Sequence, residues 1–68
     1  MADIASRFLY DRSVQRDVAA VLADMRAYFP HDHHVIDGLS KHLLDLFADD
    51  PNFDVDDWCR RARYRYDG

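Results

Sequence analysis

Large apolar residues return every three or four positions between Asp11 and Phe29, which is the pattern of a helix with one apolar face. The positions are Val14, Val18, Val21, Leu22, Met25, Tyr28 and Phe29. Asp11 or Ser13 can cap the start. Pro30 ends the element, because the residue before a proline is pushed out of the helical region. The pattern predicts a helix over residues 12–29.

A second helical pattern covers residues 33–48. Its predicted buried stripe is Ile36, Leu39, Leu43, Leu46 and Phe47, widened by Val35 and Leu44. Asp32 is a natural N-cap, since its carboxylate can accept from first-turn amides. Gly38 lies inside the helix at a cost of about 1 kcal/mol relative to alanine, and it would allow another helix to approach closely.

A third helix is predicted over residues 55–65, with a strong start signal. Asp54 is the expected N-cap, and Asp57 stands where the acid of a capping box would reach back. Phe53 before the cap and Trp58 in the first turns can form a hydrophobic staple. Arginines then gather towards the C-terminal end, where cations suit the helix dipole.

These elements predict an all-α fold, a compact three-helix bundle with helices over about 12–29, 33–48 and 55–65. The 68 residues form a single domain. Residues 1–10 are expected to be a loosely ordered N-terminal segment. The short patterns at residues 1–10 and 64–68 suit helix or extended chain equally well.

The composition limits how such a small domain can be stabilised. A single cysteine, Cys59, excludes an intrachain disulfide, and an apolar content of 49% argues against disorder. Tight helix packing or self-association into a homodimer is then expected, with a metal ion as a less favoured alternative. The chain has no export signal and no membrane-spanning apolar run, which favours the cytoplasm.

Charge is distributed unevenly along the chain. All thirteen acids are aspartates. Residues 1–29 balance to zero, residues 30–57 carry eight Asp against Lys41, and residues 58–68 carry four Arg against Asp67. An acidic middle followed by a basic end can pair within the chain or between subunits.

The basic end also suggests nucleic-acid binding, because arginines alternating with tyrosines over residues 60–66 can contact phosphates and stack on bases. A small helix-turn-helix-like DNA-binding regulator is therefore an alternative. The sequence pI of about 5.3 opposes approach to DNA. Favourable cations at a helix C-terminus explain the same arginines.

A histidine cluster could bind metal. Its candidate ligands are His31, His33, His34 and Cys59, residue types that zinc prefers. The paired spacing of known zinc elements is absent, so no metal or other cofactor is predicted, and a zinc-stabilised helical domain remains the second alternative.

Catalytic chemistry has little support in the sequence. Cys59 lies inside a predicted helix, where a cysteine is more often a small buried hydrophobe than a nucleophile. The serines occupy no nucleophile motif, and a glycine-rich phosphate loop is absent. We predict that the protein is not an enzyme.

Protein–protein interaction is the remaining class. Aromatic residues gather towards the two ends of the chain, and interfaces favour Tyr, Trp and Arg. The candidate partner-binding residues are Trp58, Arg60, Arg61, Arg63, Tyr64 and Tyr66. The alternative is that these aromatics close the core of the monomer. The partner would be another protein, or a second copy in a homodimer.

The segment 46–58 resembles the C-terminal part of short proteins of actinobacterial phages and mobile elements. Those proteins have an Asp/Asn-Pro-x-Phe-Asp turn before a helix that opens with an aromatic and carries a cysteine. Pro51, Phe53, Asp54, Trp58 and Cys59 occupy the corresponding places, although the cysteine of the pattern lies about a turn later. The resemblance implies a small non-enzymatic accessory or regulatory protein that binds a host or self partner. It assigns no active site.

Overall fold

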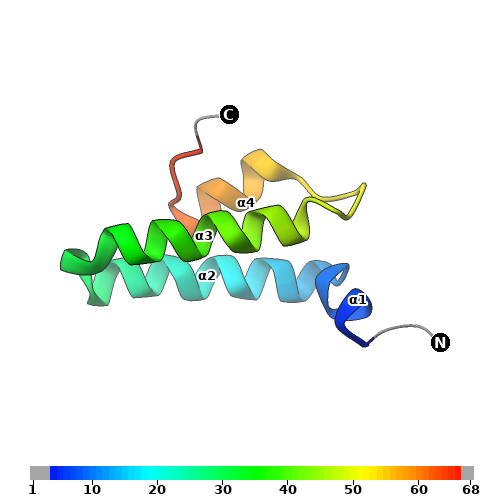
Figure 1. Cartoon of the computed structure of the whole chain (residues 1–68), viewed down its shortest axis with the longest axis horizontal. Helices are drawn as coiled ribbons and strands as arrows, with labels where there is room; N and C mark the ends of the chain where they lie inside the picture. Colours follow the sequence, from blue (N-terminus) through cyan, green and yellow to red (C-terminus); the bar gives the residue numbers. More distant parts are fainter. Residues whose placement is uncertain (1–3, 67–68) are drawn as a thin grey trace.

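The computed structural model describes residues 4–66, which form helices and connecting turns and contain no strand. The helices are α1 (Ile4–Leu9), α2 (Arg12–Tyr28), α3 (His33–Phe47) and α4 (Val55–Ala62), with a 3₁₀ turn η1 (Pro30–Asp32) between α2 and α3 (Figure 1). The all-α prediction is confirmed. Within the N-terminal segment, residues 4–9 are helical, and the remainder of it lies outside the described residues or in the turn before α2.

Figure 1 shows α2 and α3 as a long antiparallel hairpin. The helix α4 packs across this hairpin, chiefly against α2, and α1 lies at the end of the hairpin opposite to η1. The chain as a whole is elongated, with extents of 42 × 22 × 17 Å. The three longer helices therefore form two layers, a hairpin and a short helix on one side of it.

The predicted caps of α2 and α4 are confirmed. Asp11 accepts from the amides of Ser13 and Val14 at 2.8 and 3.3 Å. Asp54 accepts from the amide of Asp57 at 3.1 Å. The rings of Phe53 and Trp58 lie 6.0 Å apart, as a hydrophobic staple requires. The carboxylate of Asp57 pairs with Arg61 one turn later at 2.7 Å, in place of the capping-box contact that we expected.

One predicted cap and one predicted boundary differ from the structure, although α3 begins at His33 as predicted. Asp32 precedes α3, but its side chain makes no capping hydrogen bond, because the chain enters the helix through η1. The helix α4 ends at Ala62, three residues before the predicted end. Arg63 adopts a left-handed conformation with φ of 56°, and the amide of Tyr64 donates to the carbonyl of Cys59 at 2.9 Å. This turn directs Tyr64 back onto the core.

The core lies between the hairpin and α4. Its buried hydrophobic residues are Ala19, Leu22, Ile36, Leu44, Phe47, Trp58, Cys59 and Ala62. Two polar side chains, Gln15 and Ser40, are buried with them. The rings of Phe47, Phe53 and Trp58 form a cluster with centroids 5.8–6.0 Å apart.

The predicted apolar faces of α2 and α3 are therefore correct in part, because Val18, Met25 and Leu43 also pack against the core at its edge. Of the α2 stripe only Leu22 is fully buried, and in α3 only Ile36, Leu44 and Phe47 are. The exposed members are Val21, Tyr28, Phe29, Val35, Leu39 and Leu46. The physical reason is that α4 packs on the side of α2 that carries the small residue Ala19, where Trp58 can approach closely and donate from Nε1 to the carbonyl of Gln15 at 2.9 Å.

Candidate protein-interaction surface

The side of the hairpin that α4 does not cover carries an apolar groove of about 290 Å³. Residues of α1, α2 and α3 line it, and Asp17 is the one charged residue among them. The lining residues are Phe8, Val14, Asp17, Val18, Val21, Leu22, Met25, Leu39 and Leu43. We call this side of the hairpin the open face. It exposes Val21 and Leu39, whereas Leu22 is buried and Val18, Met25 and Leu43 pack against the edge of the core.

The α2 side of the open face has the spacing of a coiled-coil seam. Its apolar residues alternate at intervals of four and three, from Val14 through Val18, Val21 and Met25 to Tyr28. Such a stripe, which keeps one narrow seam pointed at a partner helix, is the heptad pattern. Val21 is 55% exposed and Tyr28 is 77% exposed. Val18 and Met25, which belong to the same seam, are half-buried and pack against the core, so the described chain covers this seam only in part.

The helix α3 supplies the other side of the open face. Leu39 and Leu43 line the groove, and Leu39 is 41% exposed. Val35 and Leu46, spaced one turn before and about two turns after Leu39, continue the stripe and are exposed as well. Phe8 of α1 closes one end of the groove and is 54% exposed.

Gly38 lies within α3 and borders this stripe in the helical repeat. We expected it to allow close approach of another helix. No such helix comes from the described chain, because a Cβ placed on Gly38 would meet nothing within 4 Å. The cost of glycine in a helix is about 1 kcal/mol relative to alanine. No contact within the described chain requires glycine at this position.

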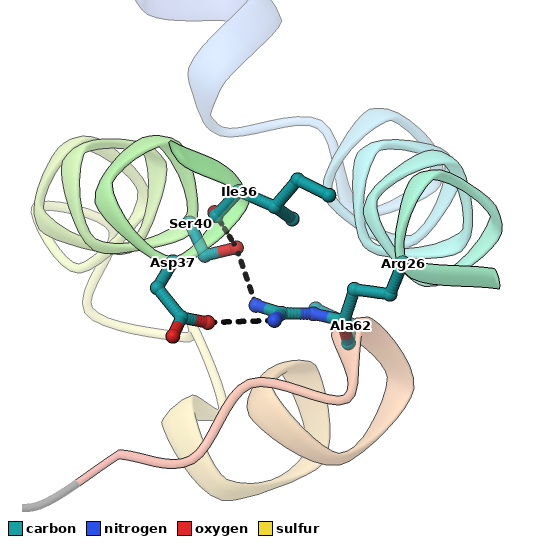
Figure 2. Close-up of polar contacts among 5 residues, drawn as sticks. All are labelled: Arg26, Ile36, Asp37, Ser40 and Ala62. Atoms are coloured by element: carbon teal, nitrogen blue, oxygen red, sulfur yellow. Dashed lines mark hydrogen bonds and ion pairs between the residues drawn. The ribbon is translucent and has the colours of Figure 1, made fainter. Parts of the chain in front are cut away.

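The opposite side of the hairpin is held by a polar cluster around Arg26 (Figure 2). Its guanidinium donates to the carbonyl of Ala62 at 3.0 Å, to Asp37 at 2.6 Å and to the hydroxyl of Ser40 at 3.0 Å. Ser40 in turn donates to the carbonyl of Ile36 at 2.7 Å. One side chain thus joins α2, α3 and the end of α4. Because each of the three guanidinium nitrogens already donates to an acceptor from the chain, we assign this cluster a structural role.

The predicted partner-binding residues do not form one surface. Trp58 is only 2% exposed, so it belongs to the core, and for this residue our alternative of closing the monomer core holds. Tyr64 is half-buried against the same core, with the Arg26 guanidinium 5.9 Å from its ring centroid. Arg61 pairs with Asp57. The remaining members, which are Arg60, Arg63 and Tyr66, are exposed.

The candidate metal ligands are not brought together. Among residues 4–66, no three His, Cys or Asp side chains form a group that could hold a metal ion. His33 and His34 stack with ring centroids 4.0 Å apart, whereas Cys59 is buried in the hydrophobic core. The set of His31, His33, His34 and Cys59 therefore does not form a site.

The shifted pKa values all have local causes. Burial raises the pKa of the Cys59 thiol, with a further contribution from Asp56, so the thiol stays protonated at neutral pH and is a poor nucleophile. The hydrogen bond from Arg61 lowers the pKa of Asp57. The hydrogen bond to Asp49 raises the pKa of Tyr10. Each of the last two shifts reflects a surface contact that joins neighbouring turns or elements.

The open face escaped our sequence reasoning, although its signal was present. The alternation of four and three in α2 is visible in the sequence, but we read it as one face of a helix in a monomer core. The buried polar residues Gln15 and Ser40 mark the side that α4 covers.

Within the described residues, no helix is both long enough and apolar enough to cross a membrane.

Comparison with protein-family models, with curated proteins and with solved structures gives no match to this chain. The resemblance of residues 46–58 to short actinobacterial phage proteins therefore stays a prediction. The function is therefore inferred from the geometry of the open face.

Proposed function

We propose that this protein is a small non-enzymatic interaction domain, and that the open face of α2 and α3 is the surface that binds a protein partner. The observation that carries the proposal is the apolar groove beside a heptad seam that is partly exposed, at Val21 and Tyr28. The resemblance to phage and mobile-element proteins adds the context of an accessory or regulatory role.

The physical support comes from the cost of leaving apolar surface in water. Removing such surface from water yields about 25 cal/mol per Å², and a large contiguous apolar patch on a small protein marks an interaction site. The exposed side chains here are large and adjacent, with Val21, Leu39 and Phe8 each between 41% and 55% exposed. A helical partner would fill such a groove with side chains three and four positions apart.

The arginine-rich end of the chain is a weaker candidate. Arg60, Arg63 and Arg65 are exposed, and charged side chains are stable in water without a partner. Trp58, which could have anchored a partner there, is occupied in the core. We therefore place the interaction surface on the open face in preference to the C-terminal arginines.

Site-specific photo-crosslinking in cells that produce the protein tests this proposal. A crosslinking amino acid at Val21 lies on the open face, whereas the same group at Ala20 lies on an exposed position outside the groove. We expect defined protein adducts from position 21 and few from position 20. Equal labelling from the two positions, or adducts only from a probe at Arg60, would overturn the proposal.

A further inference from the structure

We infer that the occupant of the open face is a second copy of this chain, which packs the same face against it in a two-fold symmetric dimer. This inference rests on the proposed function and names its partner.

The accessible surface is larger than that of a typical monomer of this mass. The chain exposes 5234 Å², whereas the scaling law for folded monomers gives about 4,450 Å² for 8.0 kDa. The elongated hairpin accounts for part of this excess, and the radius of gyration of 12.1 Å exceeds the roughly 11 Å expected for a compact domain. Because shape contributes to the difference of roughly 800 Å², this value is an upper bound on the surplus surface that a second copy would cover.

The size of the domain favours self-association. A chain of 68 residues without an intrachain disulfide buries a small fraction of its surface. Domains of this size commonly gain stability from a disulfide, a metal ion or a second subunit. The core here contains only eight buried hydrophobic residues. A second copy on the open face would add to it by burying Val21 and Leu39, which the chain alone leaves exposed.

The geometry of the hairpin suits a symmetric partner. An isologous interface uses the same patch on both subunits, and two antiparallel hairpins that stack face to face form a four-helix bundle. The seam from Val14 to Tyr28 spans two heptads, which is the element that such a bundle needs. Gly38 borders the α3 stripe without a neighbour in its own chain, so it leaves room for a partner helix.

The charges at the rim provide a signature of this partner. Asp17 lines the groove, and Asp24, one heptad later, is exposed on the same edge of α2. A second copy brings acids near acids, so added salt should strengthen the dimer by screening this repulsion. A basic partner would show the opposite dependence, because salt would screen an attraction.

Sedimentation of the whole chain from micromolar to near-millimolar concentration tests the inference. We expect the mass to rise from 8.0 kDa towards twice that value, about 16 kDa. The variant Val21→Asp should raise the dimer Kd by ~100-fold or more, because it places a charge in the apolar seam. The matched control is Ala20→Asp, which adds the same charge at the neighbouring exposed position and should change the Kd less than about three-fold.

A milder variant protects the test against misfolding. Val21→Thr keeps the shape of the side chain and introduces a hydroxyl, and it should raise the Kd about ten-fold while the circular dichroism of the dilute protein is unchanged. Raising salt from about 50 mM to 500 mM should lower the wild-type Kd several-fold.

Four results would overturn the inference. A chain that stays monomeric at every concentration and salt has no self partner. A dimer that is insensitive to Val21→Thr and Val21→Asp uses another face. A dimer that Ala20→Asp dissociates as strongly as Val21→Asp also uses another face. A dimer that dissociates when salt is added contradicts the acidic rims. The proposed function is separable, because a monomeric chain that still yields adducts from Val21 with a different protein retains the interaction role.

Discussion

The two sides of the α2–α3 hairpin differ in how their residues are packed. The side that α4 covers buries large apolar residues, such as Leu44 and Phe47, together with the small Ala19 and the polar Gln15 and Ser40. The open face carries large aliphatic residues, such as Val21 and Leu39, in contact with water. Both sides therefore carry large apolar residues, and what distinguishes the covered side is its close packing with α4 and its satisfied buried polar groups.

The covered side shows how such a fit is achieved. Ala19 leaves room for the ring of Trp58, whose Nε1 donates to the backbone of Gln15. The side-chain amide of Gln15 donates to the carbonyl of Leu9 at 2.9 Å and to the carboxylate of Asp50 at 3.0 Å. Among the described residues, every buried side-chain polar atom has a partner. A partner of the open face would have to supply the same close fit and satisfied hydrogen bonds there.

A pair of leucine truncations on α3 should show the largest contrast between the sides. Leu44 is 2% exposed on the covered side, and Leu39 is 41% exposed on the open face. Leu44→Ala should destabilise the dilute protein by about 3 kcal/mol through lost burial and a cavity. Leu39→Ala should cost about 1 kcal/mol, because folding removes less of the Leu39 side chain than of the Leu44 side chain from water. Urea unfolding at micromolar concentration measures both.

The concentration dependence of these losses sharpens the comparison. The cost of Leu39→Ala should grow as the protein is concentrated, because a partner that buries Leu39 stabilises the wild-type fold by mass action. The cost of Leu44→Ala should not grow in the same way. Equal losses for the two variants in dilute solution would contradict the assignment of the two sides.

Replacement of Arg26 should have the next largest effect. Arg26→Lys keeps the charge, but lysine cannot direct three donors to Asp37, Ser40 and Ala62 together, so we expect a loss of about 2 kcal/mol. The exposed Arg16 lies on the same helix, and Arg16→Lys should change the stability by less than about 0.5 kcal/mol. Urea unfolding of the two variants makes the comparison, and equal stabilities would show that the cluster contributes little.

The secondary structure was largely predictable from the sequence, for local reasons. Asp11, Pro30 and Asp54 act on the backbone within one turn, so their effects do not depend on the rest of the fold. The staple of Phe53 and Trp58 is also local and was predicted correctly. The early end of α4 was not predictable from composition, because it follows from Arg63 in a left-handed conformation that glycine normally adopts.

The side of the hairpin that is buried could not be predicted in the same way. The apolar arcs of α2 and α3 are wide enough to suit a partner on either side, and the choice depends on where α4 docks. Ser40 and Gln15 are polar and carried no burial signal, because their partners come from distant parts of the chain. The candidate interaction surface follows from this choice, so sequence reasoning missed it as well.

Gly38→Ala should have a smaller effect, with opposite signs in the two states of association. In the dilute protein, alanine should stabilise the fold by roughly 0.5–1 kcal/mol, because a Cβ meets no neighbour and alanine favours the helix. If a second helix packs closely on this position, the same methyl group should weaken the dimer. Thermal melting of the dilute protein and sedimentation of the concentrated protein separate the two effects. A dilute protein that alanine destabilises would contradict the open space at Gly38.

The smallest effect is expected from the surface pair of Asp57 and Arg61, which belongs to α4 and to neither side of the hairpin. The side chains are 36% and 47% exposed, so solvent screens their interaction. The contribution of this pair is measured by comparing the urea midpoints of Arg61→Gln and of the exposed control Arg65→Gln at neutral pH and in strong acid. A difference in urea midpoint that persists unchanged into strong acid would show that Arg61 acts through something other than this carboxylate.

The sign of the pH dependence follows from the pKa of Asp57, which the hydrogen bond from Arg61 lowers in the folded protein. A carboxyl with a lowered folded pKa contributes stability above its unfolded pKa, and the contribution disappears as the pH falls through the folded value. Arg61→Gln should therefore lower the urea midpoint slightly at neutral pH and not at all in strong acid. NMR titration of the Asp57 carboxyl measures the cause directly, because its pKa should return towards the ordinary value of an aspartate in Arg61→Gln and remain low in Arg65→Gln.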